Sequence, residues 1–231
     1  MKEDYGGTFA IPKREYESIV DDDSFPHRKR LEDYATTSTY VEVYTLGSVR
    51  GTWRSPLSSN FPHKSIEIEG YSQAVVNGVI YWNAVVDRIF VGTKIVSTNH
   101  RYLIMSFDFT SEEFAQLNLP GHLALDPDAH FSLYNVRESL AVIEFGGNDN
   151  DVLWMMIRHG CFNKLYSIAT GDSAIFGFRK NGALIIEYED VNSLDPVAMY
   201  EPESKNITEF ATLKGTSFVH SYKETLLLLG H

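Results

Sequence analysis

The side chains in this sequence that could carry out chemistry include a single cysteine and eight histidines. Cys161 comes two residues after His159, and a thiolate nucleophile with a neighbouring base would use such a pair. In a strand, however, both side chains would point to one face of the sheet, where a packed structural cysteine is the common case. The histidines show neither H-x-x-x-H nor H-E-x-x-H spacing, so the sequence predicts no metal site.

The acidic residues show a similar lack of catalytic patterns. The cluster at 149–151 lacks the glycine and the distal glutamate of a calcium loop, and residues 126–128 are typical of a turn. Asp108 and Glu112 could pair as acid and base, but their place between two expected strands favours solvated turn carboxylates. There is no G-x-S-x-G, P-loop or G-x-G-x-x-G motif. We therefore predict a protein that is not an enzyme and needs no cofactor.

Composition restricts the class of protein further. The chain has 231 residues, a formal net charge of −11 and 43% apolar residues, which favours a folded globular protein. The acidic balance argues against nucleic acid as a partner, because such proteins need clustered positive charge. The apolar runs are too short to span a membrane, and no secretory signal is visible. With one cysteine and no disulfide framework, the expected location is the cytoplasm, the nucleus or both.

The elements that would position any site are β-strands. Aromatic residues make up 13% of the chain and lie beside valine and isoleucine in short runs. These runs form two series of hairpin-like pairs separated by turn residues such as Asn77-Gly78 and Asn181-Gly182. One series covers 72–85, 130–145, 174–188 and 216–229, and the other covers 41–55, 103–117, 153–168 and 197–213.

Two hairpins per unit predict four antiparallel strands repeated every 40–50 residues, as in the blades of a β-propeller. The expected fold is all-β: a partial or small, kelch-like propeller of about four blades, either closed into a ring or left as an open arc, which we favour. A β-sandwich with hairpins of similar length is the alternative. Residues 41–231 would form this domain, and residues 1–40, rich in charge and poor in apolar periodicity, would form a poorly ordered N-terminal segment.

An ordered set of motifs resembles the F-box associated interaction domain of plant F-box proteins, a kelch-like group that includes S-locus F-box relatives. The matching positions run through residues 40–229 and are Val41, Glu42, Val43, Tyr44, Trp53, Gly78, Tyr81, Trp82, Ser106, Phe107, Asp108, Glu112, Phe114, Leu119, Pro120, Trp154 and Met155. The chain departs from the family at Phe162, where a tryptophan is usual. The F-box itself and the blade that normally precedes the VEVY strand are not found in the sequence.

The resemblance implies a protein-interaction domain, the substrate-recruiting part of a cullin-RING (SCF-type) ubiquitin ligase subunit. The partner would be a protein targeted for ubiquitin-dependent degradation, and docking of the ligase adaptor is not expected without an F-box. Two alternatives remain open at this point. One is a kelch-like propeller enzyme, and the other is a truncated remnant without function.

The sequence also suggests where a partner would bind. Long loops on a rigid scaffold tend to carry recognition, and 86–101 is the longest insertion between expected strands. It should share one propeller face with the loop at 146–151. The predicted partner-binding residues on these loops are Arg88, Lys94, His100, Arg101, Asn148 and Asp149. Trp53, Trp82 and Trp154 are candidate hot spots, but filling the core between blades is the more common role.

Overall fold

The computed structural model describes residues 8–18, 35–45, 53–58, 60, 66–87, 90–91, 94–95, 100–126, 128–146, 150–168, 174–187 and 195–213. These residues form sixteen β-strands. Within the same ranges, no helix has the length and apolar character needed to cross a membrane.

Three four-stranded antiparallel sheets make up most of the fold, and in each the strands lie in sequence order. We call them the first, second and third blades. The first consists of β3 (Ile66–Val76), β4 (Val79–Val86), β7 (Arg101–Asp108) and β8 (Phe114–Leu117). The second consists of β9 (Phe131–Val136), β10 (Ser139–Glu144), β11 (Asp151–Arg158) and β12 (Cys161–Ile168). The third consists of β13 (Ala174–Phe178), β14 (Leu184–Glu187), β15 (Asp195–Glu201) and β16 (Asn206–Leu213).

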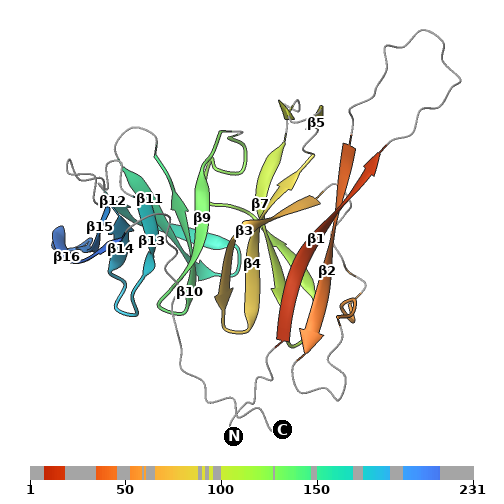
Figure 1. Ribbon diagram of the computed structural model, residues 1–231, viewed down its shortest axis with the longest axis horizontal. Coiled ribbons are helices and arrows are strands. Elements are labelled where there is room, and N and C mark those ends of the chain that lie inside the picture. Colours follow the sequence, from red (N-terminus) through yellow and green to blue (C-terminus); the bar gives the residue numbers. More distant parts are fainter. Residues whose placement is uncertain are drawn as a thin grey trace, which may run out of the picture.

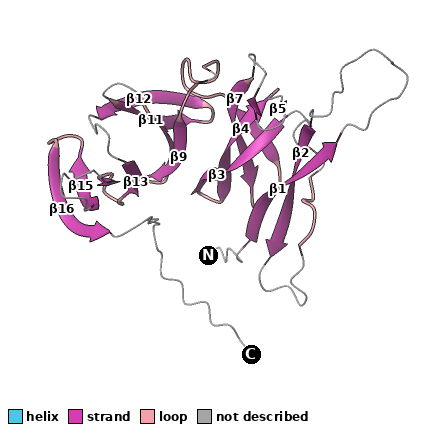
Figure 2. Cartoon of the chain, turned by 45° about the horizontal axis from the view of Figure 1, so that its top comes forward, coloured by secondary structure: helices cyan, strands magenta, loops and turns pink. Residues whose placement is uncertain are grey.

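Two smaller ribbons complete the described strands. β1 (Thr8–Ser18) pairs with β2 (Ala35–Thr45), and a short ribbon of β5 (Phe90–Val91) and β6 (Lys94–Ile95) lies within the connection from β4 to β7. Figures 1 and 2 show the sheets side by side, from the β1–β2 ribbon at one end to the third blade at the other. The first strands of successive blades contact one another, β3 with β9 and β9 with β13, as expected for strands nearest a common axis.

This arrangement confirms the predicted all-β propeller fold. Three of the predicted units are complete blades, with turns centred on Asn77-Gly78, Arg137-Glu138 and Asn181-Gly182. The hairpin expected at 41–55 is seen as an antiparallel bridge between Val43 and Arg54. The expected hairpin at 216–229 lies outside the described residues, so ring closure stays a prediction.

The expectation that residues 1–40 form a poorly ordered segment stays a prediction, but part of this range is described as a strand. Residues 8–18 form β1, which runs antiparallel to β2 over eleven residue pairs from Thr8↔Thr45 to Ser18↔Ala35. Apolar periodicity did not reveal this strand because a ladder also requires a partner strand, which the local sequence does not specify. The division of the chain into two parts at residue 40 stays a prediction.

Three hydrophobic cores lie between neighbouring sheets. The first packs Val41 and Val43 of β2 against one face of the first blade. The second joins the other face of the first blade to the second blade, and the third joins the second blade to the third. Because the first blade is covered on both faces, its inner strands carry apolar side chains on both sides, which explains the near-continuous apolar run of β4.

The three tryptophans take different places in this packing. Trp82 is completely buried in the first core, and Trp154 is half-buried against the second. Trp53 is 44% exposed and its ring packs on Tyr44, with the ring centroids 5.3 Å apart. The expectation that tryptophans fill the core therefore holds for Trp82 and in part for Trp154, and it is wrong for Trp53, which lies near the β1–β2 end of the molecule.

Polar side chains also connect the blades. Between the first and second blades, Ser72 Oγ accepts the Leu133 amide at 2.9 Å, and Asn135 Nδ2 donates to the Val75 carbonyl at 2.7 Å. Between the second and third, the Tyr134 hydroxyl donates to the Ile175 carbonyl at 3.0 Å. These bonds fix the relative positions of neighbouring blades, which apolar contacts alone do less specifically.

Tyr134 should make the contact between the second and third blades sensitive to alkaline pH. Burial, with a smaller contribution from the charge of Asp151, raises the pKa of Tyr134 to about 12. The folded-state pKa is above the unfolded value of about 10, so its stabilising contribution is complete below pH 10 and is lost as the pH rises through about 12.

We expect Tyr134→Phe to lower the free energy of unfolding by about 1 kcal/mol near pH 8. The variant should then lose less stability than the parent chain between pH 8 and pH 11. Urea unfolding followed by far-UV circular dichroism at both pH values measures the difference. Equal losses in the two proteins would show that Tyr134 is not the titrating group.

Candidate protein-binding site

The partner-binding residues predicted from the sequence are only partly described. Arg88, Asn148 and Asp149 lie outside the described residues, and of Lys94 only its backbone place in β6 is described. Arg101 is exposed at the first position of β7.

His100 is 8% exposed, and its ring meets that of Tyr102 edge to face with the centroids 5.6 Å apart. It therefore offers little surface to a partner. The predicted binding face stays a prediction, with Arg101 as its described exposed side chain.

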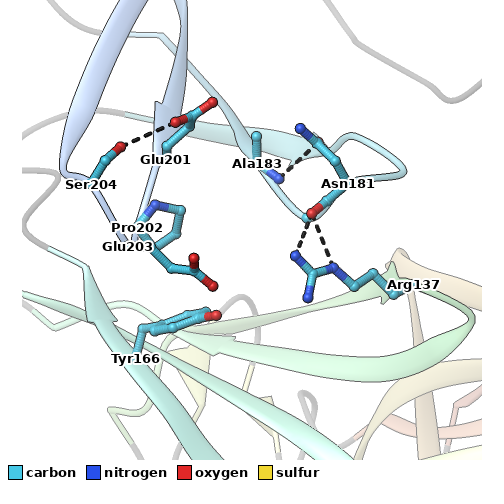
Figure 3. Close-up of a pocket in the computed structure, with 9 residues that line it drawn as sticks. Arg137, Tyr166, Asn181, Ala183, Glu201, Pro202, Glu203 and Ser204 are labelled. Carbon is cyan, nitrogen blue, oxygen red and sulfur yellow. Dashed lines mark hydrogen bonds between the residues drawn. The ribbon is translucent and has the colours of Figure 1, made fainter.

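A pocket of about 270 Å³ lies at the opposite ends of the strands, where the second blade meets the third (Figure 3). Arg137 comes from the β9–β10 turn and Tyr166 from β12, both of the second blade. The third blade contributes its β13–β14 turn and its β15–β16 turn, residues 202–205. Sequence reasoning missed this pocket because its walls come from turns of two different blades, and it favoured the longer loops on the other face.

One wall of the pocket is held by a link between turns. Arg137 Nε donates to the Asn181 carbonyl at 3.0 Å, and its Nη2 donates to the same oxygen. The backbone φ angles of Arg137 and Glu138 are 52° and 60°, the pattern of a type I′ hairpin turn. On the third blade, Asn181 Oδ1 accepts the Ala183 amide at 3.1 Å. Two tight turns from neighbouring blades thus set the position of the guanidinium.

The facing wall is acidic and aromatic. Glu201 ends β15, and its Oε2 accepts the Ser204 hydroxyl at 3.1 Å. Glu203 is exposed in the same turn, and Figure 3 shows its carboxylate directed toward the half-buried ring of Tyr166. The pocket therefore combines two carboxylates and an aromatic ring on one side with a single guanidinium on the other.

Gly182 should be essential to this arrangement. Its φ of +88° favours glycine, and a Cβ atom there would lie 2.6 Å from Arg137 Nε. We expect Gly182→Ala to displace the Arg137 side chain from Asn181 and to lower the free energy of unfolding by about 1–2 kcal/mol. Urea unfolding measures the cost.

Gly177→Ala is the matched control for that substitution. Gly177 lies in the neighbouring strand β13, and a Cβ atom there would meet nothing within 4 Å beyond its chain neighbours. A cost for Gly182→Ala no larger than that for Gly177→Ala would contradict the assigned turn geometry.

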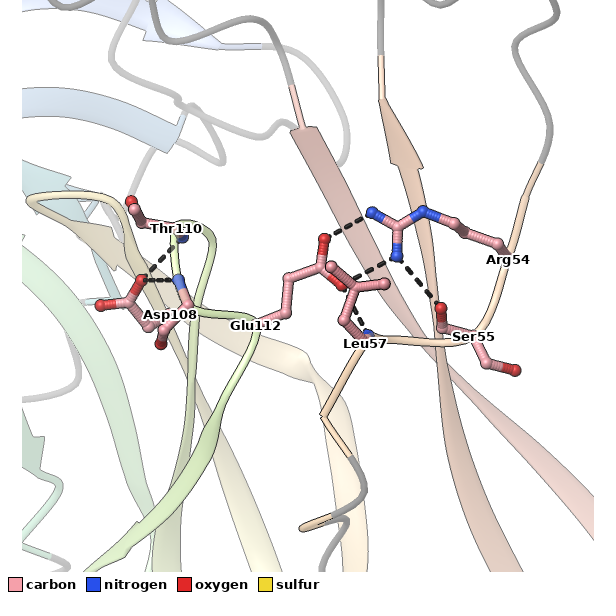
Figure 4. Close-up of polar contacts among 7 residues, drawn as sticks. Arg54, Ser55, Leu57, Asp108, Thr110 and Glu112 are labelled. Atoms are coloured by element: carbon pink, nitrogen blue, oxygen red, sulfur yellow. Dashed lines mark hydrogen bonds and ion pairs between the residues drawn. The ribbon is translucent and has the colours of Figure 1, made fainter.

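A second polar cluster attaches residues 53–58 and Asn60 to the first blade (Figure 4). Arg54 donates hydrogen bonds to both carboxylate oxygens of Glu112, one of them at 2.8 Å, and the Leu57 amide donates to Glu112 Oε2 at 2.7 Å. Asn60 meets β8 at Phe114, accepting its amide at 3.1 Å and donating to its carbonyl at 3.0 Å. The cluster is a structural clamp.

The acid–base pair considered from the sequence is therefore not formed. Glu112 is 6% exposed and bound to Arg54, which corrects the expectation that it is solvated. Asp108 is half-buried, and its Oδ1 accepts the amides of Thr110 and Ser111 at 2.7 and 3.0 Å. Each carboxylate thus serves the conformation of the β7–β8 turn.

His159 and Cys161 do not lie in one strand, contrary to the expectation from the sequence. His159 and Gly160 form the turn between β11 and β12, and Cys161 is the first residue of β12. His159 is exposed, whereas Cys161 is half-buried. Over the described ranges, no group of three or more His, Cys, Asp or Glu side chains is arranged to hold a metal ion.

Comparison with known proteins places this chain in a family. The sequence model of the F-box associated beta propeller domain matches residues 25–228, a range that includes all three blades. No curated protein matches the chain.

Two solved structures share a general likeness to the fold. TolB from Acinetobacter baumannii has 9% identity and a TM-score of 0.44, with 78% of this chain and 41% of TolB covered. Zg3597, a family 117 glycoside hydrolase from Zobellia galactanivorans, has 8% identity and a TM-score of 0.47, with 89% of this chain and 66% of that protein covered. The chain thus spans less than two thirds of either protein, and neither likeness says anything about function.

Proposed function

Because this chain belongs to the F-box associated β-propeller family, we propose that it recruits a target protein to a cullin-RING (SCF-type) ubiquitin ligase. The observation that carries the proposal is the match to the family over residues 25–228. In this role the domain selects a protein for ubiquitin-dependent degradation and catalyses no reaction itself. The plant cytoplasm or nucleus is the proposed location.

The architecture suits such a role. Three cores between sheets make a rigid scaffold, and the seams are fixed by hydrogen bonds such as that from Tyr134 to Ile175. Rigid blades hold the turns at either end in place, which reduces the entropy lost when a partner binds. A formal net charge of −11 favours partners with basic surfaces through long-range attraction.

The proposal is tested by joining the full chain to an F-box module and expressing the fusion in plant cells. We expect a defined set of proteins to gain ubiquitin and to be degraded, and a proteasome inhibitor should prevent their loss. The F-box module alone is the control. If no protein gains ubiquitin when the folded chain is attached, the proposal is wrong, and the alternatives of a propeller enzyme or a remnant without function come forward.

The same experiment distinguishes the two candidate faces. Arg88→Ala with Arg101→Ala changes the face predicted from the sequence, and Glu201→Gln with Glu203→Gln changes the pocket between the second and third blades. Arg101, Glu201 and Glu203 are exposed in the structure, and the sequence predicts that Arg88 lies on a loop. These variants should therefore fold. The pair that lowers target ubiquitination identifies the face used.

A further inference from the structure

The pocket between the second and third blades has a chemistry that selects one class of ligand. Its acidic wall holds two carboxylates, and on the facing wall Arg137 Nε and Nη2 both donate to the Asn181 carbonyl, which holds the guanidinium at the β13–β14 turn. On the acidic wall, the Ser204 hydroxyl donates a hydrogen bond to Oε2 of Glu201. Within the described part of the chain, Glu203 has no hydrogen-bond or ion-pair partner. The acidic wall therefore offers a ligand mainly acceptors, whereas the remaining N–H donors of Arg137 lie on the facing wall.

The aromatic wall favours the same class. Tyr166 is half-buried in β12, and its ring lies beneath the Glu203 carboxylate in Figure 3. A cation held between a carboxylate and the face of a tyrosine ring gains from both the ion pair and the ring quadrupole. An anion at the same place would be repelled by both carboxylates.

We propose that this pocket binds the side chain of a lysine or arginine presented by the target protein. The cationic group lies between the Tyr166 ring and the Glu203 carboxylate, Glu201 adds negative charge to the same wall, and the aliphatic stem lies along the turn of the third blade. Arg137 on the facing wall limits the pocket to one cation, because a second would meet its positive charge. This inference rests on the proposed function and specifies what the recruited protein must display.

The pocket also depends on the alignment of the second and third blades. Tyr166 belongs to the second blade and both glutamates to the third, so the site exists only while the seam between these blades is closed. The link from Arg137 to Asn181 spans that seam at the edge of the pocket. Binding a cation across the seam should consequently stabilise the pairing of the two blades.

The test uses the full chain labelled with ¹⁵N and three probes: the Nα-acetyl methylamides of lysine, norleucine and glutamate. We expect the lysine probe to shift the amide signals of Tyr166, Glu203 and Ser204 with millimolar affinity. Norleucine has a similar length without the charge and should bind more weakly, and glutamate should not bind. Stronger binding of the glutamate probe would make Arg137 the recognition group and overturn the proposal, as would the absence of any shift with lysine.

Variants assign the interaction to named groups. Glu203→Gln should weaken lysine binding about two- to fivefold, and Glu201→Gln with Glu203→Gln about tenfold, in the range that exposed ion pairs give. Tyr166→Leu should weaken it about two- to fivefold. Glu113→Gln removes the same charge from an exposed position on the first blade and is the matched control. If it weakens binding as much as Glu203→Gln, the effect is one of net charge and the pocket is not the site.

The outcomes for this inference and for the proposed function can be told apart. If the F-box fusion drives ubiquitination of targets that the Glu201→Gln, Glu203→Gln double variant also recruits, the domain recruits proteins but not through this pocket. If the lysine probe binds as expected and no protein gains ubiquitin, the pocket exists and the ligase role is wrong.

Discussion

Replacing Trp82 with alanine should lower the free energy of unfolding by about 4 kcal/mol, the largest effect expected of any single change in this chain. Trp82 is completely buried in the core between β2 and the first blade, and its Nε1 donates to Gln73 Oε1 at 3.2 Å. The substitution would leave a cavity lined by Met105 and Phe107, which belong to the same core. Urea unfolding followed by far-UV circular dichroism measures the change without relying on tryptophan fluorescence.

Trp53→Ala is the matched control for this prediction. Trp53 is 44% exposed, so the same substitution removes far fewer contacts and should cost about 1 kcal/mol. If Trp82→Ala does not fold, Trp82→Phe keeps a ring in the core and should be destabilised by an intermediate amount. Similar costs at positions 53 and 82 would contradict the packing of the first core.

Glu112→Ala should be the second most damaging change, with a cost of about 2–3 kcal/mol. The carboxylate accepts bonds from Arg54 and from the Leu57 amide, and both donors would lose a charged acceptor. Residues 53–58 would then be held to the β7–β8 turn with less strength. The neighbouring Glu113→Ala, at an exposed position, is the control and should change stability by no more than about 0.5 kcal/mol.

The same contact predicts a pH dependence. Hydrogen bonding from Arg54, helped by the Leu57 amide and opposed by burial, lowers the pKa of Glu112 below its usual value. The folded-state pKa is thus lower than the unfolded one, so the stabilisation is present above about pH 4.3 and is lost as the pH falls through the folded pKa.

Urea unfolding at pH 7 and at pH 3 tests this dependence. The difference in stability between the parent chain and Glu112→Ala should become smaller at pH 3. A difference that is the same at both values would mean that the charge of Glu112 is not what holds Arg54.

Trp82 and Glu112 both belong to the ordered motif set recognised in the sequence. The structural role that makes each of them important was not visible in the sequence. Gly78, Tyr81 and Trp82 were recognisable as a strand pattern after a turn, whereas the place of Trp82 in a core with β2 depends on how two sheets meet. Glu112 was expected to be solvated, because nothing nearby in sequence shows that Arg54, 58 residues earlier, returns to it.

The sequence by itself determined the β class, the repeated hairpins and the turns at Asn77-Gly78 and Asn181-Gly182, because these depend on local backbone preferences and side-chain alternation. Only the tertiary structure decided which turns meet. The pocket of Arg137, Tyr166 and Glu203 joins two blades, and β1 became visible only by its pairing with β2. Contacts of that kind depend on the packing of whole sheets against one another, which no short stretch of sequence encodes.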